Sequence, residues 1–121
     1  MSPSRKKRRP PLDATLARLE RRHRVLLSKL SDLGFVLRGS IAKRWTRCGQ
    51  PTCRCKASPP ELHGPYSIWT RKVAGKTVTV QLPPEQAVWC RDWSRNMRRL
   101  DRVVRALQAI GLDAASALRA P

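Results

Sequence analysis

Three cysteines and one histidine, all within residues 48–63, carry side chains that bind zinc in proteins. Cys48, Cys53 and Cys55 follow the pattern C-x4-C-x-C, and seven residues separate Cys55 from His63. Thiolate and imidazole groups are usual ligands of a tetrahedral zinc ion, and four of them close a structural site. Glycines and prolines within the same segment favour the tight turns of a knuckle. The sequence therefore predicts one structural zinc ion bound by these four residues.

The spacing leaves other interpretations open, because it differs from the common paired C-x2-C arrangement. In one of them, Cys53 packs inward, Cys48 and Cys55 are free thiols, and His63 forms a hydrogen bond with a turn. The flanking basic residues favour thiolates, so a thiol-dependent regulator or a Cys–His nucleophile is a further alternative. Cys90 is remote in sequence and is only an outside candidate for the fourth ligand.

A row of arginines forms a second group of chemically active side chains. They are Arg91, Arg95, Arg98, Arg102 and Arg105. Their spacing of 4, 3, 4 and 3 places them on one face of a helix, roughly opposite its apolar seam. Guanidinium groups bind phosphate through two hydrogen bonds at once, so we expect an exposed face that contacts phosphates. The alternative is a solvated face with ordinary salt bridges.

Basic and aromatic residues alternate in the segment that carries the cysteines, and no Asp or Glu occurs between Asp32 and Glu61. The basic residues expected to contact phosphates here are Lys43, Arg44, Arg47, Arg54, Lys56, Arg71, Lys72 and Lys76. Trp45, Tyr66 and Trp69 could stack on bases or form the small core of this segment. For Trp69, which falls on a predicted strand, the core is favoured.

The composition of the whole chain favours a polyanionic partner. Its 121 residues include 26 Lys and Arg against 8 Asp and Glu, a formal net charge of +18. This excess is typical of nucleic-acid-binding proteins, whereas solubility alone needs less charge. No acidic pair has catalytic spacing and there is no glycine-rich phosphate loop, so we expect a non-enzymatic protein.

Hydropathy and the N-terminal residues bear on localisation. No apolar run approaches the roughly 20 residues that span a bilayer, and no signal-peptide segment follows the basic N-terminus. We therefore expect a cytoplasmic protein with no membrane contact, in a reducing compartment where thiols or metal ligands are favoured over disulfides.

A heptad seam predicts the first helix that must position these groups. Leucines between residues 12 and 34 are spaced 4, 3, 4, 3, 4 and 3, with His23 on the seam. Asp13 is the predicted N-cap or first-turn acid, and Gly34 the predicted residue after the helix end.

A second seam predicts a helix over residues 84–110. It runs from Trp89 to Ile110 with the same spacing. Asn96 interrupts it, and a buried Asn at such a position often fixes register or partner number. Gly111 predicts the end of this helix.

The segment between the helices, about residues 35–83, has the alternation of a β-hairpin. Residues 67–73 and 76–82 are its predicted strands, Ala74-Gly75 its turn, and residues 40–47 a candidate third strand. The expected fold is α+β, with two long antiparallel amphipathic helices flanking a small β-hairpin insert with a Cys/His cluster. The expected organisation is a disordered basic arm at 1–11, one domain at 12–111 and a C-terminal tail at 112–121.

The stretch from Arg47 to Cys55, RCGQPTCRC, and the later HGPY at His63 to Tyr66 carry a family resemblance. They resemble a group of short, functionally uncharacterised bacterial proteins that are often encoded among mobile elements and transposase genes. Gly39-Ser40, Gly75-Lys76-Thr77 and Pro84-Glu85-Gln86 extend the resemblance over about residues 37–100. It implies a bacterial, mobile-element context, which favours DNA over RNA, and it assigns no site residues.

These features together predict a nucleic-acid-binding protein that contacts the phosphate backbone, with DNA favoured over RNA as its partner, and that associates with mobile elements and with the nucleoid. The zinc ion would hold the insert in shape. One alternative is an adaptor or accessory subunit of a transposase, recombinase or ribonucleoprotein complex, whose seams bind a partner helix. Another is RNA binding through the aromatic insert. The seams also allow a homodimer.

Overall fold

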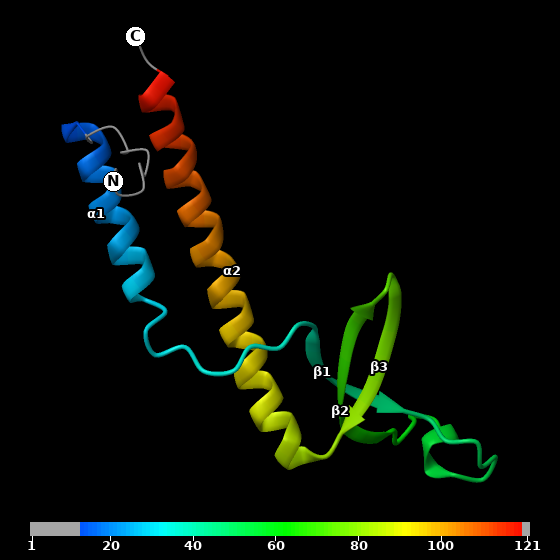
Figure 1. Cartoon of the computed structure of the whole chain (residues 1–121). Helices are drawn as coiled ribbons and strands as arrows, with labels where there is room; N and C mark the ends of the chain where they lie inside the picture. The colour runs from blue at the N-terminus through cyan, green and yellow to red at the C-terminus, as the bar shows by residue number, and fades with distance from the viewer. Residues whose placement is uncertain (1–12, 120–121) are drawn as a thin grey trace, which may run out of the picture. The chain divides into compact units, whose positions relative to one another are not determined.

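The computed structural model describes residues 13–119 and is an α+β structure (Figure 1). In chain order its elements are α1 (Ala14–Ser28), β1 (Ser40–Thr46), the short 3-10 helix η1 (Arg54–Lys56), β2 (His63–Val73), β3 (Lys76–Leu82) and α2 (Pro84–Arg119). The chain divides into two compact units. Among the described residues, the first unit consists of residues 13–33 and 100–119, and the second is Gly34–Arg99. The basic arm expected at residues 1–11 lies outside the described residues.

Helix α1 begins as the sequence predicts but ends earlier. The side chain of Asp13 accepts a hydrogen bond from the backbone N–H of Leu16 at 2.9 Å, so Asp13 is the N-cap. The prediction of a helix as far as Gly34 is wrong, because α1 ends at Ser28. The hydroxyls of Ser28 and Ser31 donate to backbone carbonyls three residues earlier, and such local bonds compete with helical continuation.

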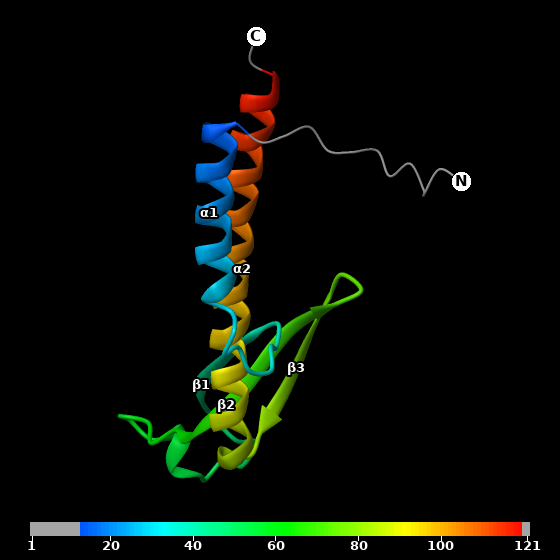
Figure 2. The ribbon, with the colours of Figure 1, turned by 60° about the vertical axis from the view of Figure 1, so that its left-hand side comes forward.

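The core of the first unit lies between α1 and the C-terminal half of α2. These two segments run side by side in opposite directions (Figures 1 and 2). Leu16, Leu19 and Ile110 are buried there, and partly buried apolar side chains pack against them, namely Leu26, Ala114 and Ala117. Three members of the first predicted seam therefore pack with Ile110, the last member of the second, in this unit.

Helix α2 continues through Gly111 to Arg119, so the predicted stop at Gly111 is wrong, and most of the expected tail is helical. Gly111 lies on an exposed side, where an added Cβ would meet nothing within 4 Å. The residues that follow include alanines and leucines, which have high helix propensity. Ala114 and Ala117 also pack against the core, so burial offsets the conformational cost of Gly111.

The second unit contains a three-stranded antiparallel sheet with strand order β1-β2-β3. The predicted hairpin turn is confirmed: Ala74 has φ 50° and Gly75 has φ 80°, the positive values of a type I′ turn. The candidate third strand is confirmed as β1. Strand β2 begins at His63, four residues before the predicted start. Nothing in the sequence alternation marks those four residues as strand.

The first half of α2 packs through a face that the predicted seam does not include. Ala87 and Ser94 are almost fully buried, and the Ser94 hydroxyl donates to the carbonyl of Gly39 at 3.0 Å. Trp89, the first seam residue, is 62% exposed. The predicted seam therefore does not mark the buried face of this part of α2, where Ser94 bonds to the segment that precedes β1.

The side chain of Asn96 forms a hydrogen bond with the segment that precedes β1. Its side-chain amide donates to the carbonyl of Phe35 at 2.8 Å, and the N–H of Leu37 donates to the carbonyl of Trp93 at 3.1 Å. These bonds attach residues 35–37 to α2 in the second unit.

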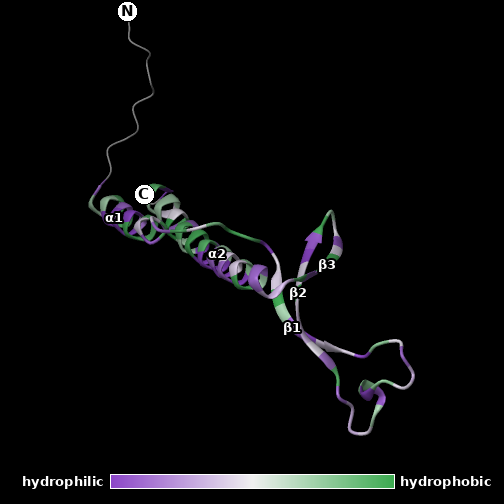
Figure 3. Cartoon of the chain, turned by 90° about the horizontal axis from the view of Figure 1, so that it is seen from below, coloured by the Kyte–Doolittle hydropathy of each residue, from purple (hydrophilic) through white to green (hydrophobic). Residues whose placement is uncertain are grey.

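Within residues 13–119, neither helix is both long enough and apolar enough to cross a membrane. Figure 3 shows hydrophilic and hydrophobic residues interspersed along both helices.

Candidate metal centre and basic surface

The register of β1 and β2 brings two of the four predicted ligands to one end of the sheet. Thr46, the last residue of β1, pairs with His63, the first residue of β2. Cys48 follows Thr46 by two residues, so it begins the loop at the same end. Gly64 adjoins His63 with φ +127°, and a Cβ there would lie 2.8 Å from the carbonyl oxygen of Arg44. This position therefore requires glycine.

The loop over residues 47–62 turns the other two ligands back toward the strand ends. The N–H of Cys53 donates to the carbonyl of Gln50 at 3.2 Å, and the N–H of Lys56 donates to the carbonyl of Cys53 at 2.9 Å. Helix η1 thus places Cys53 and Cys55 on one tight turn. The N–H of Glu61 donates to the carbonyl of Arg54 at 3.1 Å and closes the loop.

The four ligand atoms of Cys48, Cys53, Cys55 and His63 all lie within 4.8 Å of one another. The Sγ atoms of Cys48 and Cys55 are 3.6 Å apart, and Sγ of Cys53 is 3.2 Å from Nε2 of His63. Zinc–sulfur bonds of about 2.3 Å at tetrahedral angles separate two sulfurs by about 3.8 Å. The four residues could therefore hold a metal ion. Cys90 is not part of this group.

The surroundings of Cys55 favour its thiolate form. Its side chain is fully buried, and the backbone N–H of Cys48 donates to its Sγ at 3.3 Å. This hydrogen bond is the main reason that the pKa of Cys55 is lowered to about 6. The Lys56 ammonium lies 3.9 Å from the same sulfur and also donates to the carbonyl of Cys48.

The pKa of Cys53 moves in the opposite direction. A hydrogen bond with the backbone of Cys55 acts to lower it, but hydrogen bonds with the thiol groups of Cys48 and Cys55, together with desolvation, raise the pKa overall. Thiols this close share protons between them, and a divalent cation would replace those protons.

The thirteen basic residues singled out from the sequence fall in both units. Eleven lie in Gly34–Arg99, and nine of these have exposed side chains: Lys43, Arg44, Arg47, Arg54, Lys56, Lys72, Lys76, Arg95 and Arg98. Arg102 and Arg105 lie on the part of α2 that belongs to the other unit, and both are exposed. Two of the exposed arginines form ion pairs, Arg54 with Glu61 at 3.7 Å and Arg95 with Asp92 at 3.0 Å.

Arg91 differs from the sequence expectation of a fully exposed arginine row. It is only partly exposed, and its Nη2 donates to the Ser67 hydroxyl on β2 at 3.1 Å. Arg91, Arg95 and Arg98 line a small cavity of about 100 Å³ with Ile41 and the buried Ser94. This part of the row therefore borders the sheet. The sequence pattern misses this because only the tertiary structure shows which face of α2 the sheet covers.

Arg71 is also partly buried, and its guanidinium stacks on the Trp69 ring with 3.9 Å between Cζ and the ring centroid. Trp69 belongs to the structure of the sheet, because its Nε1 donates to the carbonyl of Arg38 at 2.9 Å. The Nη1 atom of Arg71 is buried without a hydrogen-bond partner in the described part of the chain.

A cavity of about 460 Å³ adjoins Arg71, and two more basic residues line it, Arg38 and Lys72. The hydroxyl-bearing residues Ser40, Thr70 and Thr77 also line this cavity. Sequence reasoning missed Arg38, because it precedes the first strand and belongs to no periodic pattern. The sequence signal that could have pointed to Arg38 is its position directly before Gly39-Ser40, one of the motifs that carry the family resemblance.

Most of the chain, including the Cys/His cluster and the sheet, matches a known protein family. Residues 16–92 match the family described as "Domain of unknown function (DUF6788)". The chain belongs to this family. The DUF6788 match includes all three strands and the whole Cys/His cluster, and it ends within the first half of α2, before Arg95 and Arg98.

One curated protein aligns with most of this chain but over only a small part of its own length. The chain is 31% identical over 94 residues, 78% of its length, to a protein named "Translation factor GUF1 homolog, mitochondrial" from Plasmodium vivax (strain Salvador I). The chain spans only about 10% of that protein's length, so the alignment establishes no shared activity. No solved structure matches the chain significantly.

Proposed function

We propose that this DUF6788 chain is a non-enzymatic nucleic-acid-binding protein that grips the phosphate backbone through its second unit, with a structural zinc ion in the Cys/His cluster. The observation that carries the proposal is the charge of Gly34–Arg99, which contains 13 Lys and Arg against 3 Asp and Glu. Nine of the eleven candidate phosphate contacts in this unit have exposed side chains. Such an excess repels itself unless a polyanion is bound.

The zinc ion would act on the shape of the basic loop. Cys53 and Cys55 bracket Arg54, and Lys56 follows directly, so fixing the two thiolates fixes the backbone that carries these charges. A structural zinc site contributes folding free energy to a loop that has little core of its own. Cys55 is the only side chain in this loop that is buried, which supports this role.

Duplex DNA is the proposed nucleic acid, in a mobile-element context and in the bacterial nucleoid. This choice rests on the resemblance of the RCG-x3-CRC and HGPY motifs to proteins encoded near transposase genes. Trp69 supports a phosphate-gripping mode over base stacking, because its ring is engaged by Arg71 and its Nε1 by the backbone. RNA binding through the insert and an accessory role in a transposase, recombinase or ribonucleoprotein complex are the competing proposals.

A salt titration tests the proposal. Fluorescence anisotropy with a labelled random-sequence duplex should show binding that weakens linearly in a log–log plot of affinity against salt concentration, with a slope of about −0.9 per phosphate neutralised. The double variant Arg95→Gln, Arg98→Gln should reduce the magnitude of this slope by roughly 2. The matched control is Arg24→Gln, Arg119→Gln, which removes the same charge from exposed positions of the other unit.

The outcomes separate the candidates. No binding to the duplex at low salt overturns the DNA proposal, and competition by structured RNA or single strands at fixed salt then identifies the RNA alternative. An equal loss of slope in the control variant means that net charge acts without a defined surface, which overturns the assignment to the second unit.

A further inference from the structure

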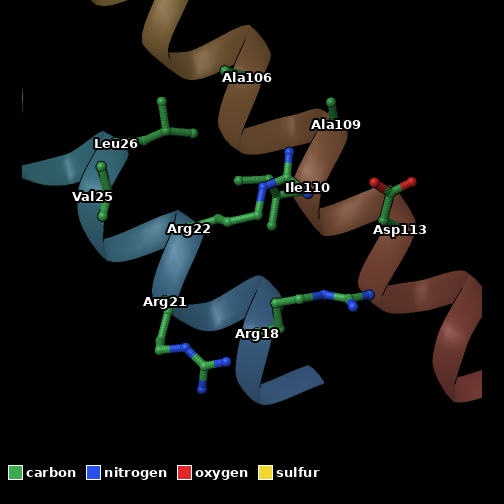
Figure 4. A pocket seen from close by; sticks show the side chains of 9 residues that line it. All are labelled: Arg18, Arg21, Arg22, Val25, Leu26, Ala106, Ala109, Ile110 and Asp113. Atoms are coloured by element: carbon green, nitrogen blue, oxygen red, sulfur yellow. The ribbon is translucent and has the colours of Figure 1, made fainter. Parts of the chain in front are cut away.

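The first unit carries a groove that the phosphate-binding surface does not include. It lies between α1 and the C-terminal half of α2 and has a volume of about 500 Å³. Its apolar floor consists of Val25, Leu26 and Ile110 with Ala106 and Ala109 (Figure 4). Two helices bury only one side of each other, so a pair of this kind leaves an apolar strip along its length.

Arginines from one helix dominate the rim. Arg18, Arg21 and Arg22 all come from α1, and all three are exposed. Figure 4 shows Arg18 and Arg22 extending from α1 toward α2 across the groove. Asp113 is the single acid among the lining residues. The groove therefore combines an apolar floor with a net positive rim.

The dimensions fit a helix. The lining residues span positions 18–26 of α1 and 106–113 of α2, which at 1.5 Å per residue is roughly 11–12 Å, or about two turns. The alanines of α2 have small side chains, and these let a third backbone approach closely.

We propose that this groove binds an amphipathic helix of a partner protein, with apolar residues spaced i, i+3 or i+4 on the floor and Asp or Glu residues facing the rim arginines. Charge complementarity selects this occupant. A nucleic acid would satisfy the arginines but would leave the apolar floor uncovered. A second copy of this chain would bring a strongly basic surface, at +18 overall, to a basic rim.

Synthetic peptides of about three helical turns test the proposal. One carries leucines at i, i+3 and i+7 with flanking glutamates; a second has lysine for each glutamate; a third has serine for each leucine. Fluorescence anisotropy against the full chain should show saturable binding of the first peptide, with both control peptides at least about tenfold weaker. Equal binding of the first and third peptides would overturn the proposal, because charge alone would then explain it.

Variants locate the binding to the groove. Arg18→Gln with Arg22→Gln should weaken the first peptide about fivefold to tenfold, as expected for two partly screened ion pairs. Ala109→Phe should weaken it at least as much, because the ring fills the floor without changing charge. Arg95→Gln with Arg98→Gln is the matched control and should leave peptide affinity unchanged. Unaltered binding to both groove variants overturns the assignment.

Two further outcomes reassign the groove. If Arg18→Gln with Arg22→Gln lowers duplex affinity as strongly as Arg95→Gln with Arg98→Gln, the groove belongs to nucleic acid. If sedimentation equilibrium shows a dimer of the chain alone that Ala109→Phe dissociates, the occupant is a second copy. Because peptide and duplex are measured separately, failure of this inference is distinguishable from failure of the proposed function.

Discussion

At the scale of single residues, the Cys/His cluster depends on ligands of unequal burial. Cys55 is fully buried and receives a backbone hydrogen bond, whereas Cys48, Cys53 and His63 are only partly buried. A buried sulfur that accepts from an N–H group is held in place before a metal binds, and preorganisation of this kind favours metal binding. In the proposed zinc site, Cys48, Cys53 and His63 would complete the tetrahedron.

Removing one outer ligand should release the metal. We expect the purified chain to contain about one zinc ion, and His63→Ala or Cys53→Ser to reduce the bound zinc to a small fraction of this, because three ligands do not close a structural site. Elemental analysis by mass spectrometry measures the stoichiometry. Cys90→Ser is the control and should retain full zinc. Full zinc in both ligand variants would contradict the assignment.

At the scale of elements, helix α2 continues past Gly111, where the sequence predicts its end. Gly111 is exposed, and no atom lies within 4 Å of a Cβ placed there. Its backbone is helical and needs no positive φ. The helix therefore continues because the residues after it are good helix formers with a buried side, although the glycine lowers local stability.

Gly111→Ala should stabilise the chain by about 1 kcal/mol, since alanine reduces the entropy of the unfolded chain and fits without a clash. Urea unfolding followed by circular dichroism measures the change in unfolding free energy. Gly75→Ala, at φ +80° in the hairpin turn, is the opposite control and should destabilise. A loss of stability in Gly111→Ala would mean that α2 does end near this residue.

At the scale of the whole molecule, charge is distributed unevenly between the two units. The unit Gly34–Arg99 has 13 basic and 3 acidic residues, whereas the described residues 13–33 and 100–119 have 8 basic and 5 acidic ones. The proposed phosphate contacts and the proposed helix-binding groove therefore differ in their dependence on salt. The groove adds an apolar floor, which salt does not screen.

Metal removal should affect only part of the molecule. Chelation is expected to raise hydrogen exchange across residues 47–63, because these residues depend on the cluster for order. The amides of residues 16–26 should keep their protection, since the core of their unit contains none of the four ligands. Hydrogen-exchange mass spectrometry checks both regions in one sample. Uniform loss of protection would mean that zinc stabilises the whole chain.

Sequence alone determined the features that rest on local chemistry. The Asp13 cap, the Ala74-Gly75 turn, the hairpin strands and the four neighbouring Cys and His residues follow from properties of residues close together in the chain. A cap needs one oxygen near one N–H, and a type I′ turn needs two positive φ values. These short-range patterns agree with the fold, whereas the helix ends predicted at Gly34 and Gly111 do not, because packing decides where those helices end.

The tertiary structure decided what depends on partners far apart in sequence. The partner of each helix face changes along α2, so Trp89 is exposed while Ser94 is buried, and Arg91 turns to Ser67. The helical period gives the same seam throughout and cannot show such a change. The arginine-rimmed groove likewise arises only where two separate helices meet. Whether a side chain is buried depends on which residues pack against it, and most of those residues are far away in the sequence.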